Sequence, residues 1–332
     1  MRLIEIKLQI LMDFKRISSR FFQLGGFRLL KEYARMGVLS SLGIGFFHIL
    51  LSGKPPKQIN SEIGEKIIPF LQDKYACILL ERKAFYQEQS LNHQRSNVVW
   101  FCWLQGIEQA PPIVKACLAS LKLHLTDREI KIITKKNWRE YIDLPEHIIR
   151  RWDNKQIPPA LFTDLLRLQL LIRHGGTWID STVLCTGTTH TKEFLDSDLF
   201  LFQYRTPETS SASFKGISNW FITSCTNNEV LLVLRDMLFA YWKDYDYTLY
   251  YFIFHVFFSM IAKEYLDIIA NMPYGYSVWS LTLENHWDES FNQKKWDKLT
   301  SLVCFHKLYY RVDDKLNNDK GNYYNWILEK YR

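Results

Sequence analysis

Apolar and polar positions along the middle of the chain alternate between strand-like runs and helix-like stripes. Val98–Leu104 is a continuous apolar run, which predicts a buried strand, and Pro111-Pro112 opens a helix that continues to about Leu123. Glu129–Thr134 is expected to be the next strand. Strand, helix and strand in succession predict an α/β fold with a mainly parallel sheet covered by helices.

The clearest helix predicted by this pattern spans Pro158–His174. Gly175-Gly176 ends it, and the strand Thr177–Asp180 follows directly. Beyond it the sequence predicts strands at 198–203 and 220–223, long helices at 227–242 and about 247–265, and a short C-terminal helix after the polar stretch 313–322.

The N-terminal region has a different pattern. Apolar residues recur there at helical spacing with Lys and Arg between them: Leu3, Ile6, Ile10, Phe14, Ile17, Phe21 and Leu24. This pattern is typical of a helix on an anionic membrane surface, and also of an amphipathic helix that docks on its own domain. The uncharged stretch Met36–Gly53 reaches the lower edge of membrane-spanning length, but four glycines weaken that interpretation.

Four regions follow from these patterns. Residues 1–57 are expected to form a basic, membrane-associating segment that ends at the linker Lys54-Pro55-Pro56-Lys57, and residues 58–96 a helical connector. Residues 97–312 form the α/β domain, and 313–332 a tail with a helix. In the connector we expect four buried side chains: Ile67, Ile68, Phe70 and Leu71.

Charge and cysteine content narrow the function classes. The net charge is +7, and residues 1–60, with ten basic and three acidic residues, account for all of it. A nucleic-acid-binding domain would carry its basic residues on the domain itself, so we expect no nucleic-acid partner. The six cysteines show no C-x-x-C spacing and no secretory signal precedes them, which favours free thiols in the cytoplasm.

Two carboxylates and an arginine are the candidate chemistry. Asp164 and Arg167 share one face of an apolar helix, so they either pair with each other or face a polar ligand. Asp180 ends a buried strand, the edge at which α/β sheets bind ligands, and Ser181 and Thr182 follow it. Such oxygen ligands suit Mg²⁺ or Mn²⁺ carrying a diphosphate.

These segments resemble a known family. Phe162–Arg167 and Gly175–Asp180 are similar to the "S/T-D-x-x-R … G-G-x-W/Y-x-D" signature of glycosyltransferase family 32, and most closely to its bacterial capsular polysaccharide synthesis branch. Three further segments resemble that branch in the same order along the chain: Val98–Gly106, Tyr251–His255 and His306-Lys307-Leu308.

The resemblance implies a GT-A fold, a Rossmann-like sheet that binds a nucleotide-sugar, and transfer of the sugar with retention at the anomeric carbon. Asp164 would bind hydroxyls of the donor, Arg167 would orient its diphosphate, and Asp180 would be the first Asp of a D-x-D metal motif. The resemblance implies further donor contacts from seven residues: Trp103 (at the base), Gly106, Gly175, Gly176, Asn219, His306 (near the diphosphate) and Lys307.

The chain departs from the family pattern at the metal motif. Thr182 stands where the motif has its second Asp, so Mn²⁺ or Mg²⁺ would bind more weakly, through Asp180, Thr182 and His306. Alternatively, cationic side chains such as Lys307 would take the place of the metal ion. The Asp expected before Tyr251 is Tyr250, and its role is not transferred.

The implied activity is a retaining transferase that extends a capsular or other surface glycan, or a lipid-linked glycan, on the inner face of a bacterial plasma membrane. A catalytically weakened sugar-nucleotide-binding or scaffold subunit is the alternative that the missing Asp motivates. The high aromatic content, 15% of residues, leaves a third hypothesis open, a glycan-binding or membrane adaptor.

Overall fold

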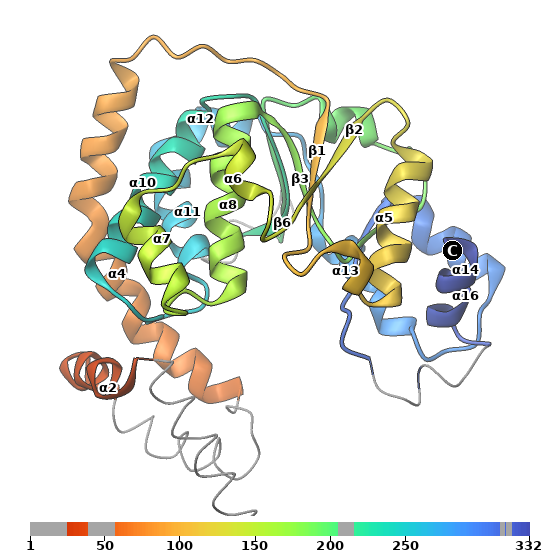
Figure 1. Cartoon of the computed structure of the whole chain (residues 1–332), viewed down its shortest axis with the longest axis horizontal. Coiled ribbons are helices and arrows are strands. Elements are labelled where there is room, and N and C mark those ends of the chain that lie inside the picture. The colour runs from red at the N-terminus through yellow and green to blue at the C-terminus, as the bar shows by residue number, and fades with distance from the viewer. Residues whose placement is uncertain (1–24, 39–56, 205–215, 313–315, 317–320) are drawn as a thin grey trace, which may run out of the picture.

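A five-stranded sheet lies at the centre of the computed structural model, which describes residues 25–38, 57–204, 216–312, 316 and 321–332 (Figure 1). The strand order is β2-β1-β3-β6-β5. β1 is parallel to both β2 and β3, whereas β6 is antiparallel to its neighbours β3 and β5. The strands span Val98–Cys102 (β1), Glu129–Ile133 (β2), Gly176–Asp180 (β3), Leu199–Gln203 (β5) and Ile217–Ser224 (β6).

Helices cover one face of this sheet and bury the even-numbered side chains of β1, such as Trp100. The long helices α8, α10, α11 and α4 form this layer together with shorter ones (Figure 1). Their bounds are Lys57–Gln87 (α4), Trp138–Tyr141 (α6), Glu146–Asp153 (α7), Pro159–His174 (α8), Glu229–Asp244 (α10), Ile253–Glu264 (α11) and Leu266–Ala270 (α12).

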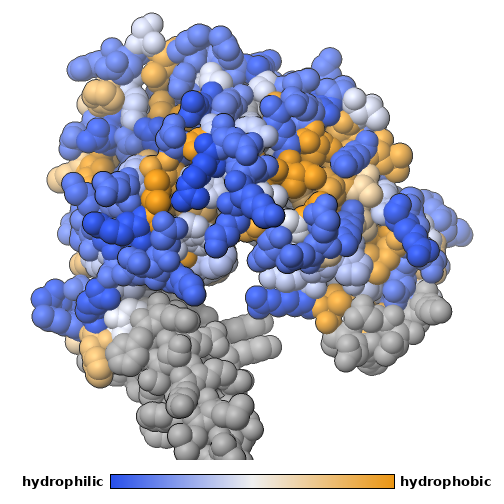
Figure 2. All heavy atoms as spheres, in the orientation of Figure 1, coloured by the Kyte–Doolittle hydropathy of each residue, from blue (hydrophilic) through white to orange (hydrophobic). Residues whose placement is uncertain are grey.

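The other face of the sheet buries the odd-numbered side chains of β1, such as Phe101, against a second layer. This layer holds a two-stranded antiparallel sheet of β4 (Val183–Cys185) and β7 (Phe305–Lys307). Its other elements are η1 (Ile107–Gln109), α5 (Pro112–His124), α9 (Thr191–Leu195), α13 (Ser277–Thr282), η2 (Leu283–His286), α14 (Gln293–Leu302) and α16 (Tyr323–Lys330). In the view of Figure 2 the surface is mostly hydrophilic, with apolar side chains in several separate patches.

The predicted fold class is confirmed: the protein is a mixed α/β fold with a mostly parallel sheet flanked by helices, consistent with a GT-A-like fold. Each strand and long helix predicted between residues 97 and 265 is present, usually within three residues of the expected bounds. The exception is the start of α11, expected near Tyr247 and found at Ile253. Tyr241 explains the delay, because its hydroxyl donates to the Tyr247 carbonyl (3.1 Å) and accepts from the Leu249 amide (2.8 Å), which fixes a turn there.

The described N-terminal part packs against the α/β domain. Helix α2 (Gly26–Arg35) buries Tyr33, whose hydroxyl donates to the Leu249 carbonyl at 2.8 Å, and Arg28 forms an ion pair with Asp246. In α4 the predicted core residues Ile67 and Leu71 are fully buried, whereas Ile68 and Phe70 are half-buried.

The amphipathic pattern of residues 3–24 and most of the uncharged stretch 36–53 lie outside the described residues. Within the described ranges, no helix combines the length and apolar character needed to cross a membrane.

Candidate functional site

A cavity of about 500 Å³ opens at the carboxyl ends of β1 and β3, where Cys102 and Asp180 are register partners. Ligands of α/β folds bind at this edge because the loops leaving the strands converge there. The cavity is lined by the turn after β1, the N-terminal half of α8, the end of β3, the first half of β6, Tyr204, residues 251–255 and residues 307–310. Its size suits one sugar-sized or nucleotide-sized ligand that remains partly open to solvent.

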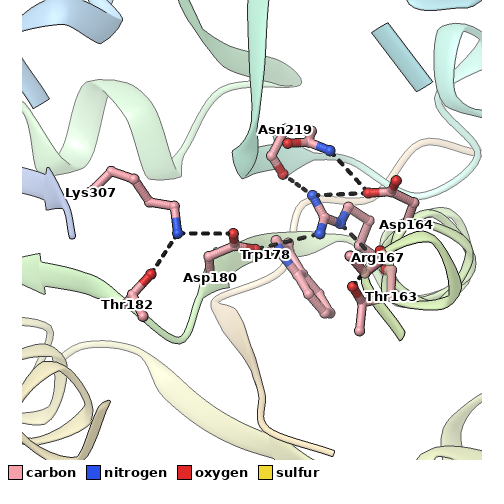
Figure 3. A network of polar contacts seen from close by, with 9 residues as sticks. Thr163, Asp164, Arg167, Trp178, Asp180, Thr182, Asn219 and Lys307 are labelled. Atoms are coloured by element: carbon pink, nitrogen blue, oxygen red, sulfur yellow. Dashed lines mark hydrogen bonds and ion pairs between the residues drawn. The ribbon is translucent and has the colours of Figure 1, made fainter. Parts of the chain in front are cut away.

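Two charged side chains of α8 form the floor of this cavity. Asp164 and Arg167 are three residues apart on one helical face, and Asp164 Oδ1 lies 3.4 Å from Arg167 Nη1. Asn219 on β6 holds both: its side-chain Nδ2 donates to Asp164 Oδ1 at 3.0 Å, and its carbonyl accepts from Arg167 (Figure 3). The side chains of Asp164 and Arg167 are only 8% and 5% exposed, so these contacts replace most of their hydration.

Asp180 links this buried pair to the mouth of the cavity. Its Oδ1 accepts a hydrogen bond from Trp178 Nε1 at 2.8 Å and lies 3.5 Å from Arg167 Nη2. Its Oδ2 lies 3.4 Å from Lys307 Nζ, which also donates to Thr182 Oγ1 at 2.5 Å (Figure 3). Asp180 and Lys307 are each about a quarter exposed, so they can meet a ligand that enters from solvent.

Burial sets the protonation behaviour of Asp164. Loss of hydration raises the pKa of this carboxyl from its ordinary value of 3.8 to about 6, with a further contribution from the negative charge of Asp180. The Arg167 guanidinium and the Asn219 amide oppose this rise without cancelling it. Asp164 is therefore ionised at neutral pH, but at a free-energy cost that a hydroxyl-rich ligand can reduce by donating hydrogen bonds to it.

Tyrosines surround the cavity mouth. Tyr251 (56% exposed), Tyr309 (43%) and Tyr310 (38%) all line it, and Tyr310 makes an edge-to-face contact with Trp103, with ring centroids 5.2 Å apart. Partial burial and the negative charge of Asp164 raise the pKa of Tyr251. Partly exposed aromatic rings in this arrangement suit contact with the apolar faces of sugars or bases.

The structure brings together most of the residues predicted for the site. Asp164, Arg167, Asp180 and Asn219 form one network, with Lys307 and Thr182 at its outer end (Figure 3). Trp103 lies on the cavity wall as expected.

The glycine pair predicted to approach the ligand lies elsewhere. Gly175 and Gly176 are at the start of β3, the opposite end of the strand from Asp180, and neither lines the cavity. Both have positive φ, and a Cβ on Gly176 would lie 2.3 Å from the Val98 carbonyl oxygen. Their role is to let the chain turn from α8 into β3. Gly106 has φ 91° in the turn after β1 and is adjacent to the cavity wall without lining it.

His306 also lies outside the cavity. Neighbouring residues of a strand point to opposite faces, so the register that directs Lys307 toward Asp180 turns His306 into the core. His306 is fully buried, its Nε2 lies 3.2 Å from Thr186 Oγ1, and burial lowers its pKa to about 4. Its position does not support the predicted contact with a metal or a diphosphate.

The side chains around Asp180 do not form the ligand set that a divalent metal requires. Asp180 faces Arg167 and Lys307, both cations, and the Thr182 hydroxyl already accepts a hydrogen bond from Lys307. Throughout the described ranges, no three His, Cys, Asp or Glu side chains lie close enough to hold a metal ion together. A metal bound here would have one protein carboxylate and two positive neighbours.

Sequence reasoning did not assign the tyrosines of the cavity mouth to the site, although Tyr251 begins one of the segments that resemble the family. The aromatic stretch 241–258 is mostly core, as Tyr241 and Phe257 show, but Tyr251 leaves the core and His255 lines the cavity. The loss of strand and helix periodicity around Tyr251 is the signal that could have separated it from its buried neighbours.

The chain matches the model of a family described as capsular polysaccharide synthesis protein. The match covers residues 50–327, which is most of the chain and includes each residue of the network. No curated protein matches the chain.

Proposed function

The chain belongs to the capsular polysaccharide synthesis protein family, and on this basis we propose that it is a glycosyltransferase that uses a nucleotide-diphosphate sugar. The observation that carries the proposal is the network of Asp164, Arg167, Asp180 and Lys307 inside a cavity at the carboxyl edge of the sheet. Two cations suit a diphosphate, and a buried carboxylate beside an amide suits sugar hydroxyls.

In the proposed reaction, the bond between the anomeric carbon of the donor sugar and the diphosphate oxygen breaks. A bond from the anomeric carbon to an acceptor hydroxyl oxygen forms, and the hydroxyl proton moves to the departing phosphate oxygen. Arg167 and Lys307 stabilise the negative charge that develops on the nucleoside diphosphate. Asp164 and Asn219 hold the sugar, so that the acceptor attacks a fixed anomeric centre.

Attack from the side on which the diphosphate leaves gives retention of anomeric configuration. This route uses the phosphate oxygen as the base, so it needs no protein nucleophile. We propose a growing surface glycan or lipid-linked glycan as acceptor, consistent with the family, with the exposed Tyr251, Tyr309 and Tyr310 rings as its platform.

Sugar transfer tests this function directly. The purified protein is incubated with UDP- and GDP-sugars and a glycan acceptor, and release of nucleoside diphosphate is followed. Asp164→Ala and Asp180→Ala should each abolish release, whereas Asp143→Ala, which removes a surface carboxylate that is 92% exposed, should not change it. Full activity in both site variants would show that the chemistry takes place elsewhere.

A donor-binding subunit without turnover is the second candidate. The contacts of Asp180 with Trp178, Arg167 and Lys307 favour a donor-binding subunit. A carboxylate held by three internal donors is suited to orienting the charges around a bound ligand. Saturable donor binding with no nucleoside diphosphate release from any acceptor would support this candidate over the enzyme.

We also propose that the basic N-terminal segment holds the protein on the inner face of the plasma membrane. Residues 1–24 carry five basic and two acidic residues among apolar positions, and α2, which follows, already docks on the domain through Tyr33. Deletion of residues 1–24 keeps α2 in place and should release the protein from anionic vesicles, and the full chain should be released by salt. Unchanged co-sedimentation of the shortened protein would rule out this role.

A further inference from the structure

Lys307 connects Asp180 and Thr182, the two positions that resemble the D-x-D motif of glycosyltransferase family 32. Its ammonium nitrogen lies 3.4 Å from Asp180 Oδ2 and donates to Thr182 Oγ1 at 2.5 Å. Asp180 and Thr182 are the first and third residues of the D-x-D-like segment, so the ammonium group of Lys307 contacts both of these side chains.

We propose that Lys307, together with Arg167, takes the place of a divalent cation, so that the protein binds its donor diphosphate without a metal. This inference rests on the proposed function, and it concerns how that site holds the donor.

The surroundings of Asp180 support this inference. Each carboxylate oxygen already faces a cation: Oδ1 lies 3.5 Å from Arg167 Nη2, and Oδ2 lies 3.4 Å from Lys307 Nζ. Trp178 Nε1 also donates to Oδ1. A divalent ion at Asp180 would have to displace an ammonium group or lie within a few ångströms of it, where the repulsion between like charges is substantial at a partly buried site.

Two other candidate ligands, His306 and Glu284, do not line the cavity. His306, the neighbour of Lys307 on β7, is fully buried and contacts Thr186. Glu284 on η2 is close enough to Lys307 for the ammonium to oppose the rise in its pKa that burial causes, but Glu284 is not part of the cavity lining. Asp180 is thus the one carboxylate that Lys307 contacts among the described ion pairs.

The four charges of the network balance one another, and a diphosphate can enter by exchanging partners. Asp164 and Asp180 balance Arg167 and Lys307, so the network is neutral when Asp164 is ionised. A diphosphate that enters can replace the Asp180 oxygens as the partner of Lys307, which is about a quarter exposed and can turn on its flexible stem. In transfer, the C–O bond to the diphosphate breaks, the electron pair goes to the phosphate oxygen, and Lys307 and Arg167 hold the resulting charge while the acceptor proton neutralises part of it.

Donor affinity measured with and without metal tests the inference. Calorimetric titrations of UDP- and GDP-sugars are carried out in EDTA and in Mn²⁺, with the full chain and with Lys307→Met and Lys307→Arg. We expect the wild-type protein to bind in EDTA, with Mn²⁺ changing the affinity by less than about threefold. Lys307→Met should weaken donor binding by about tenfold or more, because the charge-assisted contact with the diphosphate is lost. Lys307→Arg keeps the positive charge, so it should bind the donor more tightly than Lys307→Met does.

One control separates charge from structure. Lys122→Met removes a lysine that is exposed on α5 away from the cavity, and should leave donor affinity unchanged.

The outcomes distinguish the two proposals. Donor binding that requires Mn²⁺, or that is equal in Lys307→Met and wild-type protein, would overturn the role of Lys307 and leave the transferase proposal intact. Absence of binding by any nucleotide-sugar, with or without Mn²⁺, would overturn both.

Discussion

Replacing Asp164 by Asn should stabilise the protein at neutral and alkaline pH while it abolishes sugar transfer. Asp164 is buried and its pKa is raised to about 6, so the folded protein holds a proton there more tightly than the unfolded chain does. Between about pH 4 and 6 the folded state therefore carries more protons, and the contribution of Asp164 to stability falls as the pH rises through this range. Above about pH 6, the ionised Asp164 carboxylate lowers the free energy of unfolding by a constant amount.

The size of this cost follows from the two pKa values. The interval from 3.8 to about 6 corresponds to about 3 kcal/mol at 1.36 kcal/mol per pKa unit. Asn keeps the acceptor for the Asn219 amide and carries no charge, so it resembles the protonated carboxyl. The free energy of unfolding of Asp164→Asn, relative to wild type, should therefore grow by about 2 kcal/mol between pH 4.5 and pH 8.

The assay is urea unfolding of both proteins at several pH values across this interval. The free energies of unfolding of the two proteins are subtracted at each pH, because His306 also makes stability depend on pH, in the opposite direction to Asp164. His306 is present in both proteins, so its contribution cancels. Burial lowers the pKa of His306 to about 4, so its contribution to stability falls as the pH decreases from about 6.5 to 4. A stability difference that does not change with pH would refute the reasoning, since Asp164 would then have the same pKa in the folded and unfolded protein.

Three further predictions concern the start of β3, the cavity mouth and His306. Gly176→Ala should lower the free energy of unfolding in urea by at least about 3 kcal/mol, because φ is 91° and the new Cβ would meet the Val98 carbonyl oxygen. Gly187→Ala, at a position with open space around it, should change stability little, and equal losses in the two variants would contradict this. Tyr251→Ala should raise the acceptor KM about three- to tenfold while leaving donor affinity unchanged, and an effect on the donor alone would exclude Tyr251 from the acceptor platform. His306→Gln should leave donor affinity, measured by calorimetry, within about threefold of wild type, and a loss of binding would restore His306 as a donor contact.

The central sheet and its long helices could be predicted from the sequence because both faces of the sheet are covered. A strand buried on both faces is a continuous apolar run, as in Val98–Cys102, and it contrasts clearly with the amphipathic helices beside it. The three-residue strands β4 and β7 could not be predicted in this way, since three residues are too few to show a period.

The candidate site was predictable where its geometry follows from local sequence. The spacing of Asp164 and Arg167 on a helix, and the position of Asp180 at a strand end, bring these groups together once the sheet forms. Whether His306 or Lys307 faces the cavity depends on the register of β7 against β4. This pairing is long-range, so the local sequence does not determine it. A shift of one residue would exchange the two side chains.

The most direct test of the central claim is calorimetric titration of nucleotide-sugars into the wild-type protein and Arg167→Met. Arg167 contacts Asp164, Asp180 and the Asn219 carbonyl, so it joins the two halves of the network, and Met fills its buried volume without its charge. We predict one saturable site per chain in the wild type, and a loss of affinity of about tenfold or more in a variant whose circular dichroism is unchanged. Equal affinity in the two proteins, or no binding by either, would contradict the claim that this cavity holds a nucleotide-sugar.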